Sequence, residues 1–228
     1  MLTQALSLEP DYALAIVYCG YALEHAVSMG WREAGPNFRQ ECISLARRGP
    51  HLAGGDATVM TLCGMTLIFA AKEYDWGMAV AKAALEANPN NMFVVMRAGA
   101  AHINCGDLDA AMTCFHRTLR LSPRDPDIFF PLTGIAHIHC IRGNQAEAFD
   151  YASRALALNP SFGPTLWIIT ASSAHLGRME AAHRFLEELL KVAPDVTIAK
   201  LKAGNPGKDA SRLGLILDGL RLAGLPEE

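Results

Sequence analysis

Residues 92–123 read MFVVMRAGAAHINCGDLDAAMTCFHRTLRLSP, a stretch that ends in proline. Thirty-four residues separate the members of three proline pairs along the chain: Pro89 and Pro123, Pro126 and Pro160, and Pro160 and Pro194. Between these prolines, small and large residues recur at the same offsets. A fixed period of this length predicts that the chain is a stack of repeated units.

The recurring residues have physical reasons for their positions. Counting from Met92, glycine at position 15 (Gly106) can adopt the positive φ that ends a first helix and turns the chain back. Alanine at position 20 (Ala111) lets a second helix cross the first closely, and proline at position 32 (Pro123) ends that second helix. The next two units repeat the pattern with Gly143, Ala148, Leu156 and Pro160, and with Gly177, Ala182, Leu190 and Pro194.

With this period and these residues, the chain resembles the tetratricopeptide repeat (TPR) family. The resemblance implies an all-α fold, a TPR-type α-solenoid in which antiparallel helix hairpins form a right-handed superhelix. Near the end, residues 209–224 predict an amphipathic helix, because apolar residues recur on one helical face. Packed on the last repeat, this helix would cap the stack. Its apolar residues are Leu213, Ile216, Leu217, Leu220 and Ala223.

Proline spacing also divides the rest of the chain. Forty residues separate Pro10 from Pro50 and thirty-nine separate Pro50 from Pro89, which indicates two stretched repeats. The opening residues read like the last turns of a second helix, so we interpret them as the remnant of an upstream repeat, with a natural capping helix as the alternative. The expected segments are 1–10 (remnant), 11–50 and 51–91 (stretched repeats), 92–125, 126–160 and 161–194 (repeats), and 195–228 (capping helices).

Composition and charge exclude several kinds of partner. The 228 residues are 51% hydrophobic, and 20 Lys plus Arg against 23 Asp plus Glu give a formal charge of −3 without any block of like charge. Nucleic acid and anionic membranes are therefore poor partners. The longest uncharged apolar run, residues 57–71, is shorter than the roughly twenty residues of a membrane span, so we expect a buried helix there.

The six cysteines form no CxxC pair and lie in apolar helical surroundings: Cys19, Cys42, Cys63, Cys105, Cys114 and Cys140. We expect reduced, buried thiols in a cytoplasmic protein. The first lysine or arginine is Arg32, so the chain does not open with the basic region of a secretory signal.

Histidines and cysteines gather in two places, His102 with Cys105, and His137 with His139 and Cys140. A metal site is one interpretation. However, His102 and His139 both occupy position 11, where the family packs a tyrosine between helices, and His137 and His139 point about 200° apart on one helix. We favour half-buried core histidines, no metal and no cofactor.

No catalytic arrangement is recognisable either. Gly54-Gly55 precedes a helix but lacks the Lys-Ser/Thr of a phosphate-binding loop, and no turn presents a nucleophile with its base. The sequence therefore predicts a protein that is not an enzyme.

The candidate binding surface is the concave groove, which the family lines with first-helix residues at positions 2, 5, 9, 12 and 13. Such a groove would bind a peptide or a helix through aromatic and Met anchors. Plain core packing is the alternative for each residue. The best-known lysine, asparagine and arginine clamp for a C-terminal carboxylate is not expected, because position 5 holds no lysine. The candidates are Val17, Tyr21, His25, Phe93, Met96, Asn104, Thr133, His137, Ile141, Trp167 and His175.

The ending SRLGLILDGLRLAGLPEE is similar to the last segment of bacterial multidomain regulators, in which TPR repeats follow a class III adenylate or guanylate cyclase domain or a winged-helix domain. The resemblance implies a regulatory C-terminal region of a larger protein, without cyclase residues of its own. Our leading expectation is a non-enzymatic scaffold that binds a protein or peptide, and this regulatory role is the alternative. The partner could be an upstream domain, and the N-terminal end could mediate homo-oligomers.

Overall fold

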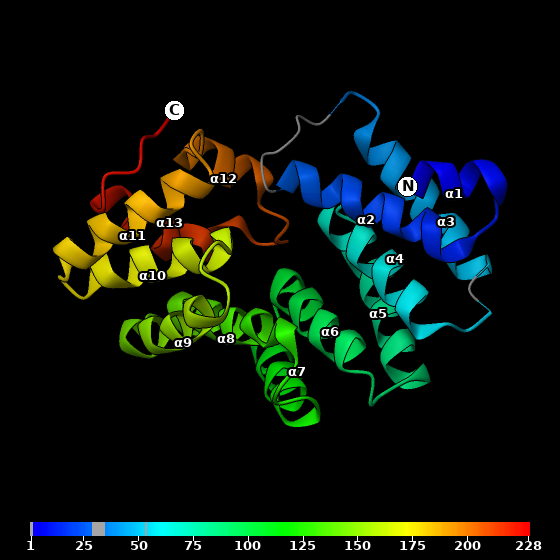
Figure 1. Ribbon diagram of the computed structural model, residues 1–228, viewed down its shortest axis with the longest axis horizontal. Coiled ribbons are helices and arrows are strands. Elements are labelled where there is room, and N and C mark those ends of the chain that lie inside the picture. Colours follow the sequence, from blue (N-terminus) through cyan, green and yellow to red (C-terminus); the bar gives the residue numbers. More distant parts are fainter. Residues whose placement is uncertain (1, 29–34, 53) are drawn as a thin grey trace. The chain divides into compact units, whose positions relative to one another are not determined.

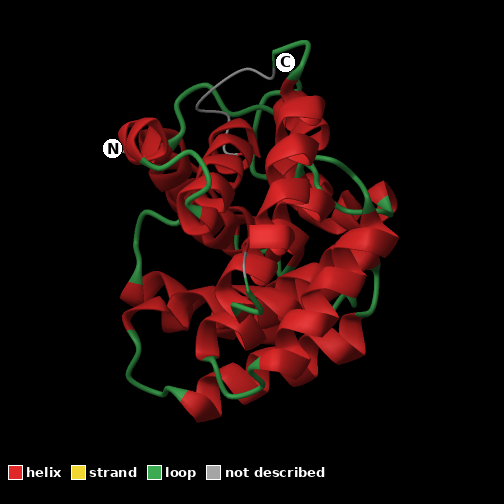
Figure 2. Cartoon of the chain, turned by 90° about the vertical axis from the view of Figure 1, so that its right-hand side faces the viewer, coloured by secondary structure: helices red, strands yellow, loops and turns green. Residues whose placement is uncertain are grey.

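The structure, a computed structural model, describes residues 2–28, 35–52 and 54–228. Every regular element in this part of the chain is a helix (Figure 2), so the all-α prediction is confirmed. The elements are α1 (Leu2–Leu8), α2 (Ala13–Ser28), α3 (Phe38–Leu52), α4 (Ala57–Phe69), α5 (Tyr74–Ala87), α6 (Met92–Cys105), α7 (Leu108–Leu121), η1 (Pro126–Ile128), α8 (Phe129–Ile141), α9 (Gln145–Leu158), α10 (Gly163–His175), α11 (Met179–Val192), α12 (Ile198–Gly204), η2 (Ala210–Leu213) and α13 (Gly214–Leu222).

The chain forms two compact units, each described by itself (Figure 1). Unit 1 comprises Met1–Cys114 and Pro206–Lys208, and unit 2 comprises Phe115–Asn205 and Asp209–Glu228. The division falls inside α7.

Within each unit, first and second helices of hairpins alternate. In unit 1, the first helices α2, α4 and α6 pack against one another in series, while α3 packs on α2 and α4, and α5 packs on α4 and α6. In unit 2, α8 packs on α10, and α9 packs on both. The surface formed by the first helices is called the helix-A face below, and the surface formed by the second helices is called the helix-B face.

The glycines at position 15 adopt the backbone that the period predicts. Their φ angles are 99° at Gly106, 79° at Gly143 and 72° at Gly177. In this left-handed region a side chain would clash with its own backbone, so glycine ends each first helix at low cost.

Small residues allow the two helices of a hairpin to approach. Ala111, Ala148 and Ala182 are fully buried. In the stretched repeat of α4 and α5, Gly77 lies at the same place, and a Cβ on it would stand 2.9 Å from the carbonyl oxygen of Gly64. The stretched repeat therefore keeps the close crossing of the regular ones.

The second helix of the first stretched repeat was expected to end before Pro50, at about Arg48, but α3 continues through Pro50 to Leu52. Proline has no N–H group, so the helix loses one backbone hydrogen bond without ending. The next described residues, Gly54 and Gly55, have φ angles of 55° and 90°, and Asp56 then caps α4 by accepting from the backbone N–H of Thr58 at 2.7 Å. The glycine pair makes the turn that proline was expected to make.

The C-terminal segment is broken into short elements. Residues Pro206–Lys208 pack in unit 1, where the N–H of Lys208 donates to the carbonyl of Asn104 at 2.8 Å and the Tyr74 hydroxyl donates to the carbonyl of Pro206 at 3.0 Å. The expected amphipathic helix forms as η2 followed by α13. Helix α13, drawn in red in Figure 1, packs on α10 and on α8.

Candidate interaction faces of the two units

The helix-A face of unit 1 carries an arginine between two aromatic rings. The guanidinium carbon of Arg97, on α6, lies 5.4 Å from the ring centroid of Tyr21 on α2 and 5.3 Å from that of Phe93 on α6. A guanidinium over a ring face is attracted by the ring quadrupole, by about 0.5–1 kcal/mol at an exposed site and more when water is excluded. The three side chains therefore hold one another in place.

Hydrogen bonding and burial strengthen this arrangement. Arg97 also donates a side-chain hydrogen bond to the Tyr21 hydroxyl oxygen, and burial raises the pKa of Tyr21 above its usual value, so the phenol stays neutral. Tyr21 and Phe93 both pack against the buried cluster of Val17, Val59, Leu62 and Cys63. A positive charge is thus fixed beside half-buried aromatic surface.

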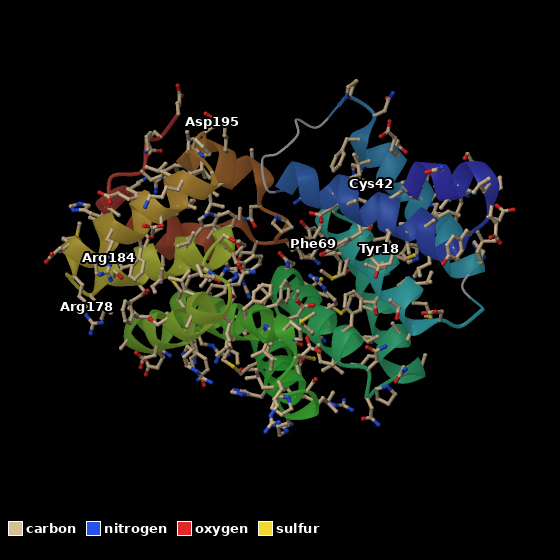
Figure 3. The ribbon with its side chains drawn as sticks, viewed as in Figure 1. Tyr18, Cys42, Phe69, Arg178, Arg184 and Asp195 are labelled. Atoms are coloured by element: carbon tan, nitrogen blue, oxygen red, sulfur yellow. The ribbon has the colours of Figure 1, made fainter. Side chains whose placement is uncertain are left out.

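Stacked arginines also occur at and within α11, the second helix of the last hairpin in unit 2. The guanidinium carbon of Arg178 lies 4.8 Å from the ring centroid of Phe149, and that of Arg184 lies 5.0 Å from the ring centroid of Phe185; Figure 3 labels both arginines. Both are exposed and each is stacked on one ring. Stacking alone therefore does not distinguish Arg97, but its position on a first helix between two rings does.

The other candidates of unit 1 have different surroundings. Val17 and Met96 are each 1% exposed, so they are core residues and do not offer surface to a ligand. Asn104 is half-buried; its Nδ2 donates to the carbonyl of Ala100 at 2.8 Å, and its backbone carbonyl is taken by Lys208. The side chain of His25 lies outside the described part of the chain.

The helix-A face of unit 2 is covered by the chain's own helix α13. His175, on α10, places its Nε2 2.7 Å from the carbonyl oxygen of Leu215, and as the N–H tautomer it donates to that oxygen. A Cβ on Gly219 would stand 2.6 Å from both the Cα and the carbonyl oxygen of Ala171, so the two helices touch backbone to backbone. Ile216, Leu217 and Leu220 of α13 are buried in one cluster with α10.

Three further candidates of unit 2 are wholly or partly core residues. Thr133 is only 6% exposed, and its hydroxyl lies 2.7 Å from that of Thr165 on α10. Trp167 is half-buried against the cluster that contains α13, and its indole Nε1 is buried without a hydrogen-bond partner among the described residues. Ile141 is half-buried near the end of α8.

The histidines occupy separate environments. Burial lowers the pKa of His137 to about 4, so this group is neutral near pH 7. His102 lies 3.7 Å from the Asp107 carboxylate, and His139 stacks on Tyr151 with ring centroids 5.6 Å apart. Burial lowers the pKa of both. Within the described residues, no three His, Cys, Asp or Glu side chains are grouped to hold a metal ion.

Comparisons with known proteins identify the architecture. No family model matches the sequence, and no curated protein matches it. Among solved structures, TTC0263, a thermophilic TPR protein of Thermus thermophilus, superposes with a TM-score of 0.65 over 92% of this chain and 99% of that one, at 14% identity. The chain has the fold of TPR proteins.

Two other solved structures share this TPR fold. PilW, a type IV pilus biogenesis factor, aligns over 91% of this chain and 89% of its own with a TM-score of 0.61 at 15% identity. The APC/C hetero-tetramer Cut9-Hcn1 aligns over 89% of this chain with a TM-score of 0.67 at 15% identity. The chain spans only 38% of that protein's length. These identities establish the fold alone.

Arg97 was not among the candidates from the sequence, although its position in the repeat unit, position 6, could have drawn attention to it. The clamp that binds carboxylates in the best-known TPR subtype places arginine there, and Arg97 occupies this position when Met92 is counted as the first. The sequence prediction searched position 5 for lysine and omitted Arg97. The residue at position 6 was the signal that could have found it.

Four of the six thiols are buried, and Cys19 and Cys105 are half-buried. Burial raises the pKa of Cys42, Cys63 and Cys140 to about 12, which leaves them as unreactive thiols at neutral pH. None of the six cysteines, all of which lie in the described part of the chain, forms a disulfide. No helix among the described residues is both long and apolar enough to cross a membrane.

Proposed function

We propose that the protein is a non-enzymatic interaction module that binds a peptide segment of a protein partner on the helix-A face of unit 1. The observation that carries this proposal is Arg97, held between Tyr21 and Phe93. Aromatic and arginine side chains dominate the binding energy of protein interfaces, because they combine large contact area with directional hydrogen bonds.

The chemistry of this face defines the ligand class. Half-buried rings of Tyr21 and Phe93 offer apolar contact, and Arg97 offers a fixed positive charge. A peptide with an apolar side chain next to a carboxylate would use both. In unit 2 the corresponding face is taken by α13, so we assign ligand binding to unit 1.

Site-specific photo-crosslinking tests this assignment. A benzophenone amino acid in place of Phe93 should crosslink to one defined partner segment in cells, whereas the same group in place of Leu158, 57% exposed on α9, should not. The captured segment should then bind Arg97→Gln about tenfold more weakly than the wild type. Equal crosslinking from the two positions, or an unchanged affinity of Arg97→Gln, would move the binding surface elsewhere.

A second candidate function comes from the ending SRLGLILDGLRLAGLPEE, which resembles the last segment of cyclase and winged-helix regulators. In that case the partner of the helix-A face is a domain of the same polypeptide. The reading frame upstream of Met1 tests it: a stop codon there, without a neighbouring catalytic domain, contradicts it. Formation of homo-oligomers through the N-terminal end remains a prediction. A monomer mass that does not change with protein concentration in sedimentation would contradict it.

A further inference from the structure

A second surface of unit 1 has the features of a binding site. On the helix-B face, a hollow is lined by residues of α3 and α5, namely Arg47, Arg48, His51, Trp76 and Val80. Three of the five are basic, two are apolar, and none is acidic. Val80 also packs against the buried cluster of Val59, Leu62 and Cys63, so the hollow has an apolar floor.

Trp76 is the apolar centre of this surface. Tryptophan is a large side chain that proteins normally bury, yet Trp76 is 37% exposed. It follows from this exposure that an apolar group of a partner can still remove indole surface from water.

The two arginines differ in what holds them. Arg48 donates to the carbonyl of Pro10 at 2.8 Å and pairs with Asp11 at 3.2 Å, so it shapes the rim. The guanidinium carbon of Arg47 lies 5.3 Å from the centroid of the Trp76 ring, and Arg47 makes no ion pair with any described residue. A guanidinium stacked on a ring keeps its N–H edge directed outward, where it can donate two parallel hydrogen bonds to a carboxylate.

We propose that this hollow binds an acidic peptide segment, with one carboxylate on Arg47 and a neighbouring apolar side chain on Trp76. Charge complementarity favours this occupant, because Arg47 and His51 have no acidic counterpart in the lining. Nucleic acid fits less well, since the sequence carries 23 acidic against 20 basic residues without a run of like charge. The site lies on other helices than Tyr21 and Arg97, so it is independent of the proposed function.

The test uses the full chain and a fluorescein-labelled peptide amide of sequence Asp-Asp-Leu-Asp-Phe-Asp, with a matched peptide in which every Asp is Asn. The acidic peptide should bind and weaken with rising salt, and the Asn peptide should bind at least about tenfold more weakly. Arg47→Gln and Trp76→Ala should each weaken the acidic peptide about tenfold. Trp76→Phe, which keeps an aromatic ring, should lose less and serves if Trp76→Ala does not fold.

The chain offers a matched control. Arg154 on α9 also stacks on a ring, 5.1 Å from Tyr151, and lines no part of this hollow. Arg154→Gln should therefore bind the acidic peptide like the wild type. Equal losses in Arg154→Gln and Arg47→Gln overturn the proposal, as does equal binding of the two peptides.

Two further results would also contradict the proposal for this hollow. They distinguish its failure from a failure of the proposed function of the helix-A face. If Arg97→Gln loses binding of the acidic peptide while Arg47→Gln binds it fully, the peptide binds on the helix-A face. Tight, Trp76-dependent binding of single-stranded oligothymidine that displaces the peptide makes the hollow a nucleic-acid site.

Discussion

The two units present the same kind of face in different states. In unit 1, the first helices display Tyr21, Phe93 and Arg97, which are partly exposed. In unit 2, the first helices are covered by α13, whose Leu217 and Leu220 are buried against them. The first helices of unit 1 therefore keep a partly exposed surface, whereas those of unit 2 form the surface on which the chain's own helix packs.

The two faces also differ in the size and charge of their side chains. Gly219 of α13 has no side chain and Ala171 of α10 has only a methyl group, so the helix backbones approach. On α6, Arg97 stacks on Phe93, and both side chains are partly exposed. A helix can be buried on small residues, whereas a large charged and aromatic surface favours partners that supply a counter-charge.

The largest predicted effect breaks the covered face of unit 2. Gly219→Ala places a methyl group where the Ala171 backbone already lies, and should lower the free energy of unfolding by about 3 kcal/mol. Gly214→Ala, at the start of the same helix, meets no atom within 4 Å and should be neutral or slightly stabilising. Urea denaturation measures both. Equal stabilities would mean that α13 does not pack on α10.

A second pair of substitutions tests what the units share. Ala111→Leu and Ala148→Leu each overfill a hairpin crossing and should cost about 2 kcal/mol. The exposed Ala157 on α9 is the control, since leucine there adds no volume to the core. Thermal melting of the three variants decides the matter, and wild-type-like melting of both core variants would show that the repeat positions are misassigned.

Acid should weaken unit 2 through His137. Its pKa falls from 6.5 in the unfolded chain to about 4 in the folded protein, so the unfolded chain binds more protons between these values. The neutral form is present above pH 6.5, and stability is lost as the pH falls toward 4, by about 1–2 kcal/mol between pH 7 and pH 5.

Urea denaturation at the two pH values measures the loss. His137→Gln should reduce the loss, while His183→Gln, at an exposed position of α11, should leave it unchanged. The same pH dependence in wild type and His137→Gln would assign the effect to other groups.

The smallest effect is kinetic and compares the units directly. Cys63 reports on unit 1 and Cys140 on unit 2, and both are fully buried. Gly219→Ala should speed the labelling of Cys140 by a thiol reagent and leave the labelling of Cys63 unchanged, because only Cys140 shares a cluster with α13. Parallel acceleration of both would indicate that the units open as one.

The helical hairpins were predictable because their signals are local. Gly106, Gly143 and Gly177 end helices through their own φ angles, and Ala111 and Ala148 mark crossings within single hairpins. The effect of Pro50 was predicted wrongly. Helix α3 continues through this proline, and the glycine pair Gly54-Gly55 makes the turn that follows the helix.

The face of each residue was less predictable. Val17 and Met96 were placed on the groove, yet each is buried, because neighbouring helix positions differ by only 100° and a small rotation exchanges core and surface. The amphipathic pattern of 209–224 predicted a helix and its apolar side, but it does not specify that the docking surface is α10 and α8. That choice is made by close contacts such as Gly219 on Ala171.

The hydroxyl pair of Thr133 and Thr165 has a consequence for how neighbouring repeats align. Thr133 donates to the carbonyl of Phe129 at 2.8 Å, so Thr165 donates to Thr133. Sliding α10 along α8 by one residue would take the Thr133 acceptor away from the buried Thr165 hydroxyl, at a cost of about 1–3 kcal/mol. Apolar side chains tolerate such slippage more readily, so this pair fixes the register in which the two helices meet.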